Sequence, residues 1–292
     1  MNSFALTMLQ RTAYYPLLGR ATRRLLKAAG RFLALPAQLQ VNLNLSARPH
    51  YAYCVYHAAE LAKRLKLKQV SILEFGVAGG NGLLFLEQFA TRVEEALDIE
   101  VQLYGFDTGV GLPEITMPED LPYWFQRSQY RMNPDSLRSA TRSATLVLGD
   151  VKNTVTDFFA KYQPAPVGAI LNDLDLYTST RDSFALFDQT ASHFLPRVFL
   201  YFDDIIGTEY EMYTACNGQL LAISDFNSRH SAIHIGLNQN LLVRPDVNYR
   251  YQIYYAHLKS HPQYRSYVGA GRQEQIESTL RLSATEPRSE LK

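Results

Sequence analysis

Short apolar runs alternate with amphipathic segments along most of this chain. Five runs have the length of a buried strand and span residues 70–75, 101–107, 145–148, 167–171 and 198–202. The segments between and before them carry apolar residues at helical spacing, over residues 51–65, 83–97, 154–162 and 180–193. This alternation predicts an α/β fold, with a doubly wound, mostly parallel Rossmann-like sheet flanked by helices. Residues 215–229 predict one more helix, and 233–235 with 251–255 predict a last pair of strands.

Acidic residues follow the apolar runs closely. They are Glu74, Asp107, Asp150, Asp173 with Asp175, and the pair Asp203 and Asp204. Because the carboxyl ends of parallel strands meet at one edge of a sheet, we expect these side chains to line a single crevice. Folds of this kind bind their ligands at that edge.

A glycine-rich loop, Gly76 to Gly82, follows the first run and opens a helix. It fits either a dinucleotide or S-adenosylmethionine. A dinucleotide loop has the pattern G-x-G-x-x-G with an acid about 20 residues on, but Ala78 takes the place of the second glycine. Glu74 suits a ligand that carries an ammonium and a sulfonium. The spacing therefore favours S-adenosylmethionine over the cofactor of an NAD-dependent oxidoreductase.

The predicted cofactor site takes one group from each strand end. Glu74 suits the methionine end, Gly76 and Gly80 let the backbone turn tightly and approach the cofactor, and Asp107 accepts hydrogen bonds from ribose hydroxyls. Asp150 either reaches the adenine amino group or caps the following helix, and the sequence leaves both interpretations open.

Three motifs, in order, resemble the signatures of the macrocin O-methyltransferase family. They are residues 106–113 (FDTGVGLP), 173–177 (DLDLY) followed by Ser179 and Thr180, and 202–204 (FDD). The resemblance covers roughly residues 71–226. It implies a class I S-adenosylmethionine-dependent methyltransferase that acts on sugar hydroxyls with a divalent metal, usually magnesium. Ala78 and Gly79 stand where the family often has a bulky and a basic residue, and no histidine base closely follows Asp175.

Four carboxylates at two neighbouring strand ends would repel one another strongly without a cation. A hard, oxygen-liganded ion such as Mg²⁺ relieves that repulsion. We expect Asp173, Asp203 and Asp204 to be the ligands, and leave Asp175 open because it could instead cap a helix. The corresponding mechanism has Asp173 or a nearby group accept the proton of a hydroxyl that attacks the cofactor methyl.

Charge is unevenly distributed along the chain. Before Glu60 there are seven basic residues and no acidic ones. We therefore divide the chain into a basic helical extension (1–50), a methyltransferase domain (51–270) and a polar tail (271–292). The extension either packs on the acidic body or rests on an anionic membrane or partner. A proline-rich insertion at about 109–142 forms either a lid-like wall or a surface excursion.

Cys54 and Cys216 match no metal or redox spacing, and no apolar stretch is long enough to cross a bilayer. We expect a cytoplasmic protein, with a peripheral membrane contact as an alternative. The predicted partner is a small hydroxylated acceptor, a saccharide or glycosylated natural product. His234, His257 and the tyrosines of 249–267 could line the acceptor pocket or a homo-oligomer contact. Nucleic-acid methylation ranks lower because the bases are confined to one end, and a non-catalytic cofactor-binding protein is the other alternative.

Overall fold

The computed structural model describes residues 35–269, which contain one mixed sheet of seven strands in the order β3-β2-β1-β4-β5-β7-β6. The first five in this order run parallel, and β7 pairs antiparallel with β5 and β6. The strands are β1 (Gln69–Phe75), β2 (Glu100–Asp107), β3 (Thr145–Leu148), β4 (Val167–Asn172), β5 (Phe194–Phe202), β6 (Ile233–Leu237) and β7 (Ile253–Leu258).

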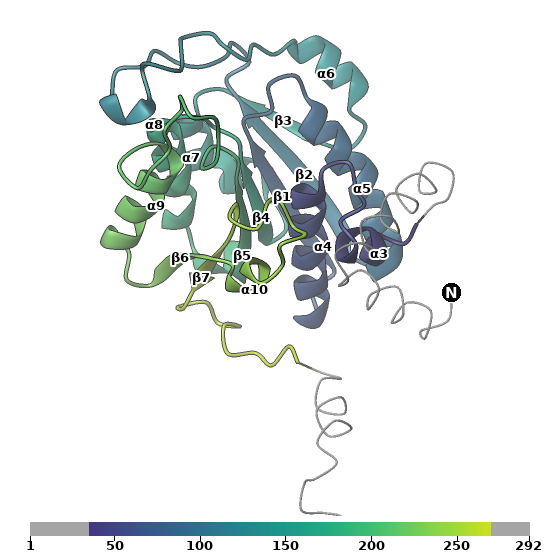
Figure 1. The fold of residues 1–292 in the computed structure, drawn as a ribbon. Helices are drawn as coiled ribbons and strands as arrows, with labels where there is room; N and C mark the ends of the chain where they lie inside the picture. The colour runs from purple at the N-terminus through teal and green to yellow at the C-terminus, as the bar shows by residue number, and fades with distance from the viewer. Residues whose placement is uncertain (1–34, 270–292) are drawn as a thin grey trace, which may run out of the picture.

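Helices cover both faces of this sheet (Figure 1). One face carries α3 (Ala37–Asn42), α4 (Pro49–Arg64) and α5 (Asn81–Leu97). The opposite face carries α7 (Val151–Tyr162), α8 (Tyr177–Ser183) and α9 (Gly218–Arg229). Three further helices are α6 (Pro134–Ala140), α10 (Gln239–Leu242) and the 3₁₀ helix η1 (Pro118–Asp120).

Two apolar cores result from the alternation of side chains along each strand. In β1, Val70 and Ile72 join the core beneath α4 and α5, whereas Leu73 and Phe75 join the core beneath α7, α8 and α9. The sheet is therefore buried on both faces, which explains why its strands appear in the sequence as nearly continuous apolar runs.

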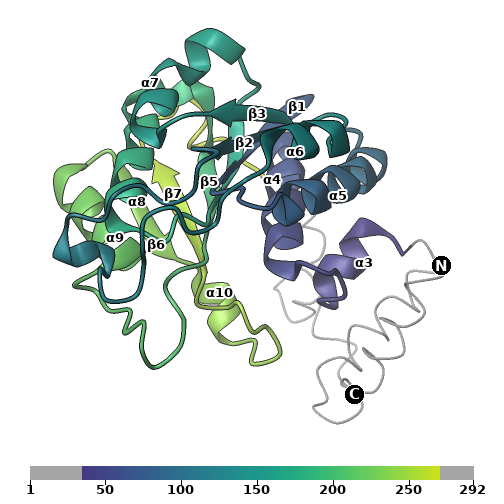
Figure 2. The same cartoon turned by 90° about the horizontal axis from the view of Figure 1, so that it is seen from above.

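The chain reverses its direction across the sheet between β1 and β4. From β1 it builds outward through β2 to β3, and then returns to β4 on the other side of β1. Ligand sites of doubly wound sheets lie at this switch point, outside the carboxyl ends of the strands. The segment between β2 and β3, with η1 and α6, crosses this edge (Figures 1 and 2).

The predicted doubly wound sheet is confirmed, and the structure refines several bounds. The single helix expected over 180–193 is instead α8, followed by two 3₁₀ helices, η2 (Phe184–Asp188) and η3 (Ala191–His193). Strand β5 starts at Phe194, four residues before the expected start. Helix α4 begins at Pro49, just inside the predicted extension. The basic segment 17–34 and the tail 271–292 lie outside the described residues.

Cys54 is buried and Cys216 exposed, and both are free thiols. Between residues 35 and 269, no helix combines the length and the apolar character that crossing a bilayer requires.

Candidate functional site

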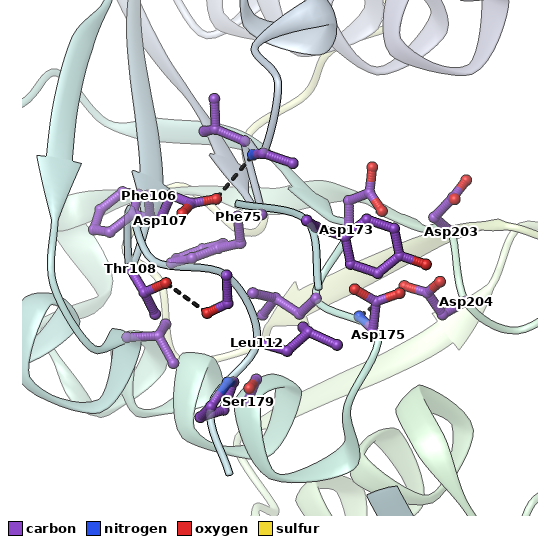
Figure 3. A pocket seen from close by; sticks show the side chains of 18 of the residues that line it. Phe75, Phe106, Asp107, Thr108, Leu112, Asp173, Asp175, Ser179, Asp203 and Asp204 are labelled. Carbon is purple, nitrogen blue, oxygen red and sulfur yellow. Dashed lines mark hydrogen bonds between the residues drawn. The ribbon is translucent and has the colours of Figure 1, made fainter. Parts of the chain in front are cut away.

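A cavity of about 570 Å³ opens at the switch point (Figure 3). Its wall includes the ends of β1, β2, β4 and β5, the glycine-rich loop, the residues that follow β3, and part of the insertion. Figure 3 shows Asp107 and Thr108 on one side, with Asp173, Asp175, Asp203 and Asp204 gathered on the other. The structure thus brings the predicted strand-end acids together around one cavity.

The glycine-rich loop passes very close to the end of β4. Gly76 has φ +84°, and a Cβ at this position would lie 1.6 Å from the main-chain oxygen of Asp173. Only glycine fits such an approach. Gly80 also has a positive φ and precedes the first residue of α5, but it faces Leu137 and does not line the cavity. Gly76 therefore lies in the wall of the predicted cofactor site, and Gly80 shapes the loop from behind.

Asp107 accepts hydrogen bonds from two main-chain N–H groups, one in the glycine-rich loop and one just after β2. Its Oδ2 accepts a hydrogen bond from Ala78 N at 2.8 Å, and its Oδ1 accepts one from Gly109 N at 2.7 Å. The carboxylate holds the glycine-rich loop against the end of β2 while still facing the cavity. Each carboxylate oxygen has a second lone pair, so Asp107 can also accept from a ligand hydroxyl.

Glu74 is almost fully buried at the end of β1, with 1% of its surface exposed. Its Oε1 accepts a hydrogen bond from the Tyr51 hydroxyl at 2.9 Å, whereas its Oε2 has no partner among the described residues. Burial raises the pKa of Glu74 to about 8. A buried, unsatisfied carboxylate oxygen in a cavity wall fits a cationic hydrogen-bond donor on a ligand.

Three carboxylates meet where β4 and β5 end. Asp173, Asp203 and Asp204 each offer an oxygen, and these oxygens all lie within 4.8 Å of one another. Burial, followed by the charge of Asp203, raises the pKa of Asp173 well above its usual value. Burial and neighbouring acids also raise the pKa of Asp204. Such a set of hard oxygen donors fits a divalent cation such as Mg²⁺.

Side chains from distant parts of the chain fix this group. The Tyr201 hydroxyl donates to Asp203 Oδ1, and Gln252 Nε2 donates to the Asp203 main-chain oxygen at 2.9 Å. On the next residue, Asp204 N donates to Gln219 Oε1 at 3.1 Å. The pair Asp203 and Asp204 is therefore anchored by β5, by the segment before β7 and by α9.

Asp175, which the sequence left open, adjoins this group in a strained turn. Its φ is +59°, and its N–H donates to Asp204 Oδ2 at 2.9 Å. Burial, then the charge of Asp203, raises the pKa of Asp175 to about 7. The hydrogen bond from the Asp175 N–H orients the Asp204 carboxylate. Asp175 therefore contributes to the site through its main chain, whatever its own carboxylate does.

The two interpretations of Asp150 turn out to be compatible. Its Oδ1 accepts a hydrogen bond from Lys152 N at 2.9 Å, which makes it the N-cap of α7. The residue also lines the cavity beyond β3. The cap is what the structure shows, and contact with adenine stays a prediction.

The insertion forms part of the cavity wall and has a small core of its own. Leu121 and Phe125 are buried against Leu176, while Leu112, Phe125 and Tyr130 line the cavity.

Asp120 fastens the insertion to the body. Its carboxylate, with 1% of the residue exposed, accepts hydrogen bonds from Thr178 N at 2.8 Å and from Thr178 Oγ1 at 2.9 Å. The insertion thus borders the cavity and has a small core of its own, and its role as a lid stays a prediction.

The structure also adds residues that sequence reasoning missed and leaves some candidates outside the site. Arg48 and Glu211 line the cavity, whereas His234, His257 and Tyr249 do not. His234 and His257 are cross-strand neighbours on β6 and β7. The glycine-rich loop has no basic side chain, and this absence could have directed attention to a basic residue elsewhere, such as Arg48.

The fold is similar to that of solved methyltransferase structures. The crystal structure of CalS11, a calicheamicin methyltransferase, matches with a TM-score of 0.50 at 21% sequence identity, over 83% of this chain and 93% of that one. The chain therefore has a Rossmann-like methyltransferase fold. The O-methyltransferase NovP matches with a TM-score of 0.48 at 13% identity, over 72% of this chain and 79% of that one. No protein-family model and no curated protein sequence matches the chain.

Proposed function

We propose that this protein is an S-adenosylmethionine-dependent O-methyltransferase that uses Mg²⁺ to methylate a hydroxyl of a saccharide or another small natural product. The observation that carries the proposal is the carboxylate group of Asp173, Asp203 and Asp204, which shares one cavity with the unsatisfied Glu74 Oε2. The similarity of the fold to that of CalS11, a calicheamicin methyltransferase, supports the same class.

The strand order supports one placement of the cofactor. Asp150 follows β3, Asp107 ends β2 and Glu74 lies at the end of β1, and these strands are consecutive in the sheet. Adenine, ribose and the methionine amino group would meet these three residues in that order. Asp173, Asp203 and Asp204, which would hold the metal, lie at the neighbouring ends of β4 and β5.

Asp173, Asp203 and Asp204 would hold the metal. When bound, Mg²⁺ supplies positive charge that lowers the pKa of an acceptor hydroxyl, and S-adenosylmethionine supplies the methyl group. Tyr201, Gln219 and Gln252 keep the pair Asp203 and Asp204 in position. Orientation of this kind increases the rate because the reacting groups are already held in the geometry of the reaction, which lowers the entropic part of the barrier.

Asp173 is the proposed proton acceptor. It lines the cavity at the end of β4, beside the pair Asp203 and Asp204, and a general base must lie within hydrogen-bond reach of the proton that it accepts. Leu112, Phe125 and Tyr130 of the insertion border the same cavity, and they would limit the access of water to the acceptor.

Calorimetric titration of chelator-treated protein with S-adenosylmethionine, and then with Mg²⁺, tests the proposal. Asp173→Ala and Asp203→Ala are expected to abolish Mg²⁺ binding and to retain cofactor binding. Asp188→Asn, at an exposed carboxylate outside the cavity, is the matched control. Unchanged Mg²⁺ binding in both site variants would refute the metal assignment, and failure of the wild type to bind the cofactor would refute the function.

Transfer of a labelled methyl group to hydroxylated saccharides and phenolic diols then tests the acceptor class. Methylation of a hydroxyl that depends on added Mg²⁺ is the expected outcome. Transfer that persists in excess chelator would show that the metal takes no part. The cytoplasmic location, the peripheral membrane contact and a homo-oligomer stay predictions from the sequence.

A further inference from the structure

The wall of the cavity is strongly acidic, and the described residues contribute a single cationic side chain to it. Among the described residues, ten carboxylate side chains line it, and Arg48 is the one basic side chain that does so. The carboxylates are Glu74, Asp107, Glu114, Asp150, Asp173, Asp175, Asp182, Asp203, Asp204 and Glu211. Any anionic group on a ligand would be repelled over most of this wall, and Arg48 marks the one place that would attract it.

Arg48 stands beside Glu74, at the end of the cavity assigned to the methionine part of the cofactor. It directly precedes α4, and its guanidinium carbon lies 5.2 Å from the centre of the Tyr51 ring. The Tyr51 hydroxyl in turn donates to Glu74 Oε1. Burial raises the pKa of both Glu74 and Asp173, and the positive charge of Arg48 offsets part of that rise. A cation and a buried carboxylate thus stand side by side, joined by one tyrosine.

The guanidinium has donors to spare. It makes no hydrogen bond or ion pair with another residue of the described chain, and its only assigned contact is the face of the Tyr51 ring. Stacking on an aromatic face leaves the planar N–H groups of arginine available for a carboxylate. The Tyr51 hydroxyl occupies Glu74 Oε1. The other carboxylate oxygen, Oε2, is without a partner in the described residues.

We propose that Arg48 binds the α-carboxylate of S-adenosylmethionine while Glu74 Oε2 accepts a hydrogen bond from its α-ammonium. This inference rests on the proposed function, and it names the residues that recognise the amino-acid part of the cofactor. The glycine-rich loop from Gly76 to Gly82 contains no basic side chain, so a cationic contact with this carboxylate must come from another part of the wall. A bidentate arginine–carboxylate pair gives both affinity and orientation.

Decarboxylated S-adenosylmethionine tests the assignment, because it keeps the ammonium and the sulfonium and lacks only the carboxylate. Dissociation constants for it and for S-adenosylmethionine are measured by calorimetry on wild type, Arg48→Gln, Arg48→Lys and Glu74→Gln. Arg64→Gln, at the exposed C-terminal end of the same helix, is the matched control. Thermal unfolding of each variant confirms that it is folded.

Wild type is expected to bind S-adenosylmethionine more tightly than the decarboxylated compound. Arg48→Gln is expected to weaken binding of S-adenosylmethionine by roughly 10- to 100-fold, the usual value of a charge-assisted hydrogen bond, and to leave binding of the decarboxylated compound nearly unchanged. Arg48→Lys keeps the charge without the fork and is expected to fall between the two. Glu74→Gln is expected to weaken binding of both compounds.

Two results would overturn the inference and leave the proposed function standing. One is an unchanged affinity for S-adenosylmethionine in Arg48→Gln and Arg48→Lys. The other is an equal loss of affinity for both compounds, which would mean that Arg48 acts on the cavity wall and not on the carboxylate. If wild type binds neither compound, the proposed function fails and this inference fails with it.

Discussion

Removing the hydroxyl group of Tyr201 separates the positioning of the proposed metal ligand Asp203 from the packing of the core. The side chain lies on β5 with 2% of its surface exposed, and its ring stacks on His50 at a centroid distance of 4.5 Å. Its hydroxyl donates to Asp203 and accepts from Gln252 Nε2 at 3.4 Å. Tyr201→Phe keeps the ring and its stacking, and removes only these two hydrogen bonds.

The size of the effect follows from the role of that bond. Loss of a hydrogen bond that orients a metal ligand usually weakens metal affinity by about 10- to 100-fold, or roughly 1.4 to 2.8 kcal/mol. Burial and the charge of Asp203 raise the pKa of Tyr201, so the hydroxyl keeps its proton and acts as the donor. The Gln252 bond is long at 3.4 Å, so the cost is close to that of one buried hydrogen bond, about 1 kcal/mol of folding free energy, or about 2 to 4 °C in Tm for a chain of this size.

Isothermal titration of Mg²⁺ into chelator-treated Tyr201→Phe measures the affinity, and thermal unfolding measures the stability. Tyr255→Phe, on the neighbouring strand β7, is the matched control, because it removes a part-buried hydroxyl contact of 3.5 Å with Tyr53 of α4. We expect similar Tm shifts in the two variants and weaker Mg²⁺ binding only in Tyr201→Phe. Equal Mg²⁺ affinity in both variants and wild type would refute the reasoning.

Three other predictions test the cavity wall. Asp120→Ala removes the carboxylate that accepts the hydrogen bonds from Thr178. It is expected to cost about 1 to 3 kcal/mol of folding free energy and to speed proteolysis within the insertion; an unchanged cleavage rate would contradict this. Burial raises the folded-state pKa of Glu74 from 4.5 to about 8, so the native state retains a proton that the unfolded chain releases. The free energy of unfolding of wild type, measured in chelator, should therefore fall between about pH 5 and 8 relative to Glu74→Gln, and a difference independent of pH would argue against it. Gly76→Ala places a Cβ 1.6 Å from a main-chain oxygen at the end of β4, whereas Gly79→Ala meets nothing within 4 Å. Denaturant titration should show a loss of about 3 kcal/mol or more for the first and about 0.5 kcal/mol or less for the second, and equal stabilities would refute the clash.

The strands and the acids at their ends could be predicted because both follow from local pattern. An apolar run of four to eight residues bounded by glycine or an acid indicates a buried strand, and parallel strands bring their ends to one edge. Asp173, Asp203 and Asp204 therefore came together as expected. Residues 180–193 were harder to assign, because a short apolar run does not distinguish the 3.6-residue turn of an α-helix from the tighter turn of a 3₁₀ helix.

The supporting residues could not be predicted in the same way. Tyr51 and Arg48 belong to the start of a helix that precedes the sheet in the chain, and Gln252 lies just before the last strand. Their approach to Glu74 and Asp203 depends on how elements far apart in sequence pack together. Contacts of this kind follow no periodic pattern in a single sequence, so they cannot be inferred from the spacing of residues along the chain.

The order of the strands has a consequence for the synthesis of the protein. Strand β5 carries Tyr201 and leads to Asp203 and Asp204, the proposed metal ligands. One of its edges pairs only with β7, which is made about fifty residues later. Strand β6 pairs with β7 alone and cannot cover that edge first. A nascent or truncated chain that ends before residue 253 therefore exposes a long apolar strand edge, the kind of surface that aggregates. Expression of shortened forms will fail at this point for reasons unrelated to catalysis, and a C-terminal boundary beyond β7 is needed for any functional fragment.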